Sequence, residues 1–145
     1  MPLPTETDYW EGVAQKCVGG ENTLLDNVWK RPEQIKRLLK YQWLGAKVLE
    51  IGCGNGIVAG SMRLILQGHF SYLGTELAQS FREYANKQFN LNTVESDVLE
   101  LPGTGYDRII ALDSLEHVRP EHRELGYAKI ASVAAKDALL FIHLS

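Results

Sequence analysis

The stretch Val48-Leu-Glu-Ile-Gly-Cys-Gly-Asn-Gly56 decides the fold. Its first four residues form a short, mostly apolar run, typical of a strand in a parallel sheet that is covered on both faces. Gly52, Gly54 and Gly56 follow, and at such positions a backbone without Cβ atoms can approach a ligand closely. A dinucleotide-binding turn has the spacing G-x-G-x-x-G, but here Ile57 stands at the place of the third glycine, which comes one residue earlier. The stretch therefore predicts a nucleotide-cofactor site of another type.

The chain from residue 47 onward alternates between short apolar runs and segments with helical periodicity. This arrangement is typical of parallel strands that are joined by crossover helices, so we predict an α/β fold. Strands are expected at 48–51, 70–75, 93–96, 108–112 and 138–144, and helices at 56–67, at 77–89 and from Pro120 onward. The buried stripe of the last helix is expected to consist of Leu125, Ala128, Ile130, Ala131 and Ala134.

The glycine pattern, read as E-x-G-x-G-x-G from Glu50, resembles the first motif of the class I S-adenosylmethionine-dependent methyltransferases. Three further landmarks follow in the order of that family, at 72–76, at 95–102 and at 106–118, the last with the Glu-His-Val run common among small-molecule members. The resemblance implies a Rossmann-like, doubly wound, mainly parallel sheet of about five strands in the order 3-2-1-4-5, preceded by N-terminal helices.

The same resemblance implies which residues bind the cofactor, S-adenosylmethionine, and its product S-adenosylhomocysteine. Glu76 would accept hydrogen bonds from both ribose hydroxyls, and Asp97 and Val98 would read the adenine edge. The other implied cofactor-binding residues are Glu50, Gly52, Cys53, Gly54, Gly56, Leu77, Leu112 and Asp113. Independently of the family, ligands of open parallel sheets bind beyond the carboxyl ends of the strands, where the acids among these residues lie. The alternative for each acid is a helix N-cap or an exposed loop position.

Methyl transfer from a sulfonium depends mainly on positioning, so a catalytic base is needed only for an acceptor that must lose a proton. His117, just past the fourth predicted strand, is the candidate base, and the alternative is that it packs at the start of the next helix. His69, His122 and His143 have no partners at ligand spacing, so no metal site is predicted.

Length and composition, 145 residues with 45% hydrophobic content, predict a single domain over 1–145. Within it, residues 1–46 would form an N-terminal helical or lid segment and residues 47–145 the α/β core. No apolar run is long enough to span a membrane, and the two cysteines offer no disulfide framework or zinc spacing, which favours a cytoplasmic protein.

The net charge of −3 disfavours a protein that coats nucleic acid. Residues 27–47 are nevertheless basic, and we expect mainly a solvated helix face with Pro32 at its first position. The alternative is contact with an anionic substrate or partner. The basic residues are Lys30, Arg31, Lys36, Arg37, Lys40 and Lys47, against Glu33 alone.

Near the N-terminus, Tyr9 and Trp10 either anchor the segment on the sheet edge, which we favour, or form part of a lid over the cofactor. The family's sheet normally continues past its fifth strand into an antiparallel hairpin, which is missing here. We therefore expect a shortened form of a longer methyltransferase. A second copy or another chain that covers the fifth-strand edge is the alternative.

The predicted function is transfer of a methyl group from S-adenosylmethionine to a small-molecule acceptor. A binding module without turnover is the alternative, and an NAD-dependent oxidoreductase is disfavoured by the glycine spacing.

Overall fold

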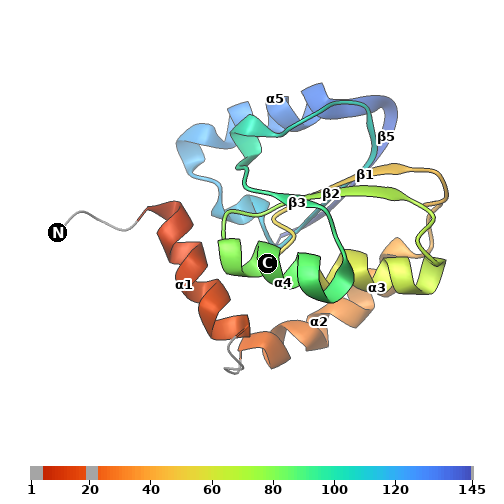
Figure 1. Cartoon of the computed structure of the whole chain (residues 1–145). Coiled ribbons are helices and arrows are strands. Elements are labelled where there is room, and N and C mark those ends of the chain that lie inside the picture. Colours follow the sequence, from red (N-terminus) through yellow and green to blue (C-terminus); the bar gives the residue numbers. More distant parts are fainter. Residues whose placement is uncertain (1–4, 19–22, 145) are drawn as a thin grey trace.

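A single parallel sheet forms the centre of the computed structural model, which describes residues 5–18 and 23–144 (Figure 1). Its strand order is β3-β2-β1-β4-β5 and every neighbouring pair is parallel, which confirms the predicted topology. The strands are β1 (Lys47–Ile51), β2 (Ser71–Thr75), β3 (Thr93–Val94), β4 (Tyr106–Leu112) and β5 (Ala134–His143).

Helices cover both faces of this sheet. In Figure 1, α2, α3 and α4 lie below it and α5 lies above it, while α1 stands at one end of the strands. The helices are α1 (Glu6–Val18), α2 (Thr23–Leu38), α3 (Ile57–Leu66), α4 (Gln79–Phe89) and α5 (Arg123–Val133). Short 3-10 turns follow the strands at η1 (Val98–Glu100), η2 (Leu115–His117) and η3 (Pro120–His122).

Strand β1 shows why the opening stretch is apolar on both sides. Successive side chains of a strand point to opposite faces, so Val48 joins the core under α2 and α3, whereas Leu49 and Ile51 join the core under α5. Each of these three side chains is at most 5% exposed. Because helices pack on both faces of the sheet, β1 holds the glycine turn that follows it in one fixed position at the carboxyl end of the strands.

The prediction for α5 was wrong in its buried face. Leu125 is 63% exposed, and Ala128 and Ala131 are exposed as well. Ile130 is buried as predicted, and its buried neighbours on this face are Gly126 and Val133, at spacings of four and three residues. A Cβ at residue 126 would lie 3.1 Å from the side chain of Val98, so a glycine allows close packing on η1.

Several element boundaries also differ from the predictions. β3 ends at Val94, β4 begins at Tyr106, β5 begins at Ala134, and α4 begins at Gln79. Pro32 lies inside α2 and not at its first position, because the helix begins at Thr23. α3 agrees with the prediction, with Val58 and Met62 buried and the left-handed Gln67 and Gly68 ending it.

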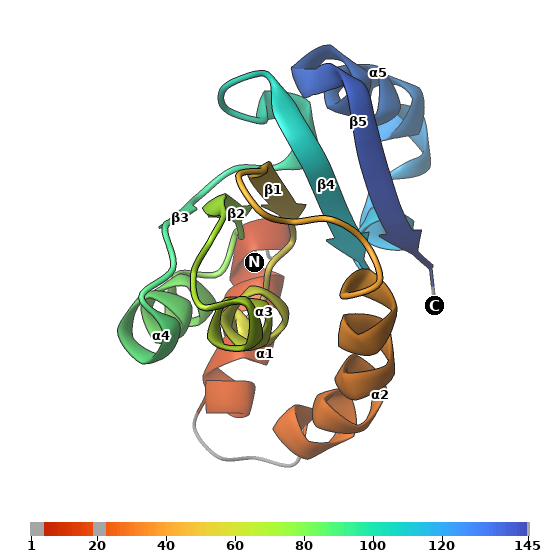
Figure 2. The ribbon, with the colours of Figure 1, turned by 90° about the vertical axis from the view of Figure 1, so that its right-hand side faces the viewer.

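Strand β5 forms one edge of the sheet, as Figure 2 shows. Its side chains Leu139, Leu140 and Ile142 are 40%, 46% and 49% exposed. Phe141 points to the face opposite that of Leu140 and Ile142 and packs on Trp43, with 5.2 Å between the ring centroids. Within the described ranges, no helix is both long and apolar enough to cross a bilayer.

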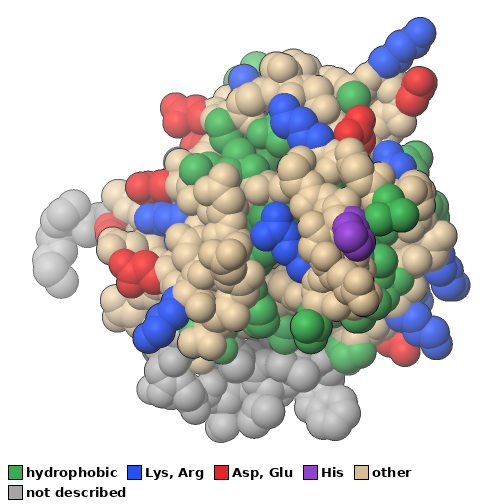
Figure 3. All heavy atoms as spheres, turned by 45° about the vertical axis from the view of Figure 1, so that its right-hand side comes forward, with side chains coloured by type: hydrophobic (Ala, Val, Ile, Leu, Met, Phe, Trp, Pro, Cys, Tyr) green, Lys and Arg blue, Asp and Glu red, His purple; other side chains and the backbone are tan. Residues whose placement is uncertain are grey.

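The basic residues of α2 divide between solvent and the molecule's interior. Lys36 and Arg37 of α2, and Lys40 just after it, are exposed, as predicted for a solvated face. Arg31 is only partly exposed and faces the site described below. The side chain of Lys30 lies outside the described part of the structure. On the face drawn in Figure 3, basic side chains of the described residues stand apart from one another, between acidic and hydrophobic ones.

Candidate functional site

A cavity of about 380 Å³ opens at the carboxyl ends of β1, β2 and β4. It brings together every predicted site residue except Gly56. These are Glu50, Gly52, Cys53, Gly54, Glu76, Leu77, Asp97, Val98, Leu112, Asp113 and His117. Helix α1 closes the cavity from the side opposite the strands, with Trp10, Val13 and Cys17 in its lining.

The three glycines after β1 have different roles. All have positive φ angles, 68° at Gly52, 57° at Gly54 and 83° at Gly56, a conformation that suits glycine. A Cβ on Gly52 would lie 2.7 Å from the Cβ of Ser114, and one on Gly56 would lie 2.8 Å from the Cβ of Ala85. Only at Gly54 is the space within 4 Å of such a Cβ empty. The predicted ligand approach therefore fits Gly54 best, whereas Gly56 serves the packing of α3 against α4.

Glu76, at the end of β2, is tied directly to the glycine loop. Its Oε1 accepts a hydrogen bond from the backbone N–H of Gly54 at 3.0 Å, and its Oε2 accepts one from Ala78 at 3.0 Å. Burial raises the pKa of this carboxyl, and the two amides oppose that effect. Each carboxylate oxygen has more than one lone pair, so acceptor capacity remains on the cavity side.

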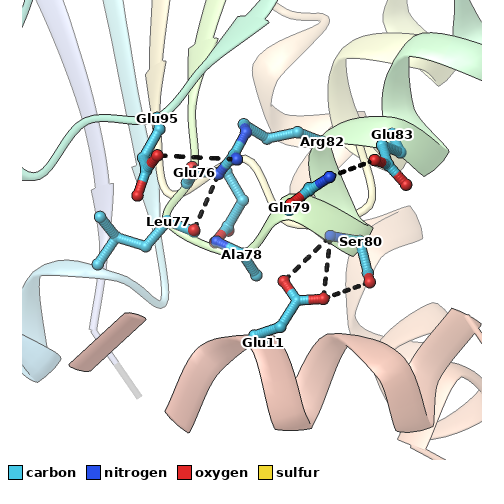
Figure 4. A network of polar contacts seen from close by, with 9 residues as sticks. All are labelled: Glu11, Glu76, Leu77, Ala78, Gln79, Ser80, Arg82, Glu83 and Glu95. Atoms are coloured by element: carbon cyan, nitrogen blue, oxygen red, sulfur yellow. Dashed lines mark hydrogen bonds and ion pairs between the residues drawn. The ribbon is translucent and has the colours of Figure 1, made fainter. Parts of the chain in front are cut away.

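The loop after Glu76 is fixed by Arg82 from α4, as Figure 4 shows. Arg82 Nη1 donates to the carbonyl oxygens of Glu76 at 2.7 Å and of Leu77 at 2.8 Å. Its Nη2 lies 4.0 Å from a carboxylate oxygen of Glu95. The position of Glu76 is therefore set both by the glycine loop and by the first turns of α4.

Helix α1 docks on the same part of α4. The carboxylate of Glu11 accepts hydrogen bonds from the backbone N–H and the hydroxyl of Ser80, as Figure 4 shows. These bonds lower the pKa of Glu11, and they satisfy an N–H in the first turn of α4 that has no partner within the helix. Ala14 and Cys17 pack against Ala78 and Phe81 beside this contact.

The favoured prediction for Trp10, an anchor on the sheet edge, was wrong. Trp10 lines the cavity, and its ring stands edge-on to that of His117 with 5.0 Å between centroids. Tyr9, its neighbour, is 61% exposed. In α1, Trp10, Val13, Ala14 and Cys17 recur at helical spacing, which marks the face that is covered but not the element that covers it.

Glu50 is a buried acid in the cavity wall. It is 2% exposed, and its Oε1 accepts a hydrogen bond of 2.7 Å from the hydroxyl of Tyr72. Burial raises the pKa of Glu50 to about 7, although the Tyr72 hydrogen bond and the charge of Arg31 act in the opposite direction. A cation that enters the cavity would favour the charged form of this carboxyl.

Asp113, where β4 ends, is held by side chains from α2 and β5. Its Oδ1 lies 2.6 Å from His143 Nδ1, and its Oδ2 lies 3.6 Å from Arg31 Nη1 and accepts from Gln34 Nε2 at 3.4 Å. Partial burial opposes ionisation, but these groups hold the pKa of Asp113 below its usual range. His143 thus has a partner that sequence spacing did not reveal.

The adenine-reading residues of the prediction lie at η1. Asp97 is exposed and its Oδ1 accepts from the backbone N–H of Leu99 at 2.8 Å, so it caps this turn. Val98 is 7% exposed and borders the cavity. The capping alternative therefore holds for Asp97, which leaves its other carboxylate oxygen for a ligand.

His117 lies in η2, and its side chain is 47% exposed. Its Nε2 is 3.9 Å from Glu116, and its ring meets Trp10, so it has both a packed face and a face toward the cavity. Eight polar residues of the lining were not predicted, namely Glu6, Arg31, Asn55, Thr75, Ser96, Ser114, Arg119 and His122. The buried hydroxyl of Ser114 has no hydrogen-bond partner among the described residues.

No group of three or more His, Cys, Asp or Glu side chains in the described part of the chain could hold a metal ion. The polar groups of the cavity are instead single acids at strand ends, backbone amides and basic side chains.

Known proteins resemble this chain in sequence and fold. The profile of the family described as "Methyltransferase domain" matches residues 48–137. Juvenile hormone acid O-methyltransferase of Bombyx mori is 22% identical over 99 residues, which cover 63% of this chain and 36% of that protein. The chain thus spans about a third of the length of this curated relative.

Solved structures resemble it as well. A TehB-like SAM-dependent methyltransferase from Corynebacterium glutamicum matches 92% of this chain and 69% of its own, with 23% identity and a TM-score of 0.66. Coclaurine N-methyltransferase bound to N-methylheliamine and SAH matches 75% of this chain and 35% of its own, with 25% identity and a TM-score of 0.64.

Proposed function

Because the chain belongs to the methyltransferase domain family, we propose that its cavity binds S-adenosylmethionine and that it transfers the methyl group to a small-molecule acceptor. The observation that carries the proposal is the hydrogen bond from Gly54 to Glu76. It places a carboxylate that can accept from ribose hydroxyls directly beside a backbone position that is open to a ligand.

The residues of the cavity fit such a cofactor. Gly54 offers an open cradle, and the unpartnered hydroxyl of Ser114 offers a hydrogen bond. A sulfonium with an ammonium group favours carboxylates nearby, and Glu50, Glu76 and Asp113 supply them. When bound, the cofactor would supply an electrophilic methyl group on a good leaving group.

We assign the parts of the cofactor along the strand order. The adenine would lie at Asp97 and Val98 after β3, the ribose at Glu76 after β2, and the amino-acid tail over β1 and β4. Cys53, Leu77 and Leu112 would provide apolar contacts, and Gly52 would let the loop pass under Ser114.

For the tail we add Arg31, which was predicted to lie on a solvated face. Its guanidinium lines the cavity beside the carboxylate of Asp113, and its charge also acts on the carboxyl of Glu50. A tail that carries both a carboxylate and an ammonium would find a cation and two acids there. The chain's contribution to catalysis would be to hold the acceptor in line with the reactive bond, with α1 excluding water.

A general base at His117 is required only if the acceptor must lose a proton. Acceptors of both kinds occur among the similar proteins, one of which is an O-methyltransferase and another an N-methyltransferase. A binding module without turnover would show cofactor affinity but no methyl transfer.

The direct test is calorimetric titration of the chain with S-adenosylhomocysteine and, separately, with NAD. We expect saturable binding of S-adenosylhomocysteine and none of NAD at the same concentrations. Preferential binding of NAD, or no binding of either compound, would refute the proposal.

A further inference from the structure

If the proposed function holds, the strand order determines how the cofactor lies in the cavity, with one end near β2 and β3 and the other near β4. Neighbouring strands lie about 4.8 Å apart, so the ends of β2 and β4, which flank β1, are separated by roughly 10 Å. With the ribose at Glu76 after β2, the reactive methyl would lie toward the end of β4. The acceptor must then contact the segment that follows β4, namely η2 and η3.

That segment carries three of the basic side chains of the cavity wall, the fourth being Arg31 of α2. His117, Arg119 and His122 all line the cavity within six residues. Among the described residues, the side chains of Arg119 and His122 have no ion-pair or hydrogen-bond partner. The acids at the strand ends are already engaged, Glu76 by two backbone amides and Asp113 by Arg31 and His143. The side chains of Arg119 and His122, near the acceptor position, are therefore free for a ligand.

An apolar surface adjoins these groups. Trp10 packs its ring against His117, and Val13, Leu115 and Val118 line the same cavity. A molecule that fits this part of the site has an apolar body and an acidic group. An ammonium acceptor would be opposed by the charge of Arg119 as well as by that of the sulfonium.

We propose that the methyl acceptor is the carboxylate of a small molecule with an apolar body, bound by Arg119 and His122. The oxygen of the carboxylate supplies the electron pair of the new C–O bond, the C–S bond breaks, and its electron pair stays on sulfur. A carboxylate and a sulfonium thus give a neutral methyl ester and a neutral thioether. No proton moves, so His117 contributes a hydrogen-bond donor and does not need to act as a base.

The test uses the chain saturated with S-adenosylhomocysteine, whose binding is measured first. Calorimetric titration then compares 4-phenylbutyrate with 4-phenylbutyramide, which has nearly the same shape and no charge. We expect the carboxylate to bind at least about tenfold more tightly, because hydrogen bonds to a charged group are the stronger ones.

Two arginine variants locate the effect. Arg119→Gln should remove the preference for the carboxylate and leave the affinity for S-adenosylhomocysteine unchanged. Arg37→Gln, an exposed position on α2 outside the cavity lining, loses the same charge and should keep the preference. With tritiated S-adenosylmethionine, 4-phenylbutyrate should give a product that releases methanol in mild base, as a methyl ester does.

The inference is overturned if the carboxylate binds no better than the amide, if neither binds, or if Arg119→Gln keeps the preference. Methyl transfer to 4-phenylbutylamine but not to the acid would overturn it as well. In each of these cases binding of S-adenosylhomocysteine leaves the proposed function standing. Failure of that first titration would overturn both.

Discussion

The carboxylate of Glu76 and the backbone N–H of Gly54 are joined by a hydrogen bond of 3.0 Å, so the end of β2 and the loop after β1 form one unit. The two residues lie 22 positions apart in the chain. A hydrogen bond from the backbone N–H of Ala78 to Glu76, and one from Arg82 to the carbonyl oxygen of Glu76, fix this unit before any ligand binds. Such preorganisation lowers the cost of ordering on binding.

Glu76→Ala should weaken the binding of S-adenosylhomocysteine about tenfold or more, because charge-assisted hydrogen bonds to the ribose are lost. Titration calorimetry measures the effect. Glu83→Ala, which removes an exposed acid of α4 that bonds to Gln79, is the control and should bind as the parent does. Unchanged affinity in Glu76→Ala would remove this residue from the site.

Gly54→Ala and Gly45→Ala form a matched pair, since both residues have positive φ angles, 57° and 69°, and open space around a new Cβ. Each should lower the free energy of unfolding by about 1 to 2 kcal/mol through backbone strain. Only Gly54 lines the cavity, so only Gly54→Ala should also weaken S-adenosylhomocysteine binding. Equal binding by both variants would place the ligand away from the loop.

Arg31→Gln should reduce the affinity for S-adenosylhomocysteine about tenfold and leave that for 5′-methylthioadenosine unchanged, because the latter lacks the amino-acid tail. Competition titrations with the two compounds give the comparison. Arg37→Gln, on the exposed side of α2, should change neither affinity. Parallel losses for both compounds in Arg31→Gln would mean that the side chain does not recognise the tail.

Glu50 should make stability fall as the pH rises. Its pKa is raised from 4.5 to about 7 by burial, so the folded state keeps the proton longer than the unfolded state does. This contribution is complete below pH 4.5 and is lost as the pH rises through about 7. Relative to Glu50→Gln, the parent should lose up to about 3 kcal/mol of unfolding free energy across this window.

Denaturant titrations at several pH values would measure that loss. Tyr72→Phe should move the upper end of the window to higher pH, because the hydrogen bond that favours the carboxylate is removed. The same pH dependence in the parent and in Glu50→Gln would contradict the assignment.

Glu11→Gln should loosen α1 from α4, because the charged acceptor for the Ser80 N–H becomes neutral. Amide hydrogen exchange should become faster in Glu6–Val18 and remain slow in β1 and β4. Since the pKa of Glu11 is lowered, its contribution is present above pH 4.5 and is lost as the pH falls through the lowered value. Glu124→Gln, an exposed acid of α5, should leave exchange in α1 unchanged.

The sequence predicted the sheet well because strand-length apolar runs, interrupted by glycine turns, have few alternative structures. It failed for α5, where Leu125 and Tyr127 remain exposed while Gly126 is buried, since a glycine carries no hydrophobic signal. It also began β5 four residues late, because Lys136 and Asp137 lie within an edge strand whose outer side tolerates charge.

For the candidate site, the acids at strand ends could be located because the parallel topology fixes where strands end. Arg31 and Trp10 could not be assigned to the site from the sequence, since their positions depend on how α2 and α1 pack on the core. His143 pairs with Asp113 only because β5 lies beside β4 in a particular register, in which Leu112 faces His143. Long-range packing of this kind leaves no local pattern.

The bond between Glu11 and Ser80 has a consequence for folding order, because 69 positions separate its partners. Helix α1 leaves the ribosome well before α4 exists, and closing so long a loop costs more entropy than pairing β1 with β2 or β2 with β3. We expect β1, β2, β3 and α3 to assemble first and α1 to dock late. During that interval, Trp10 and the cavity it covers are open to water and to chaperones.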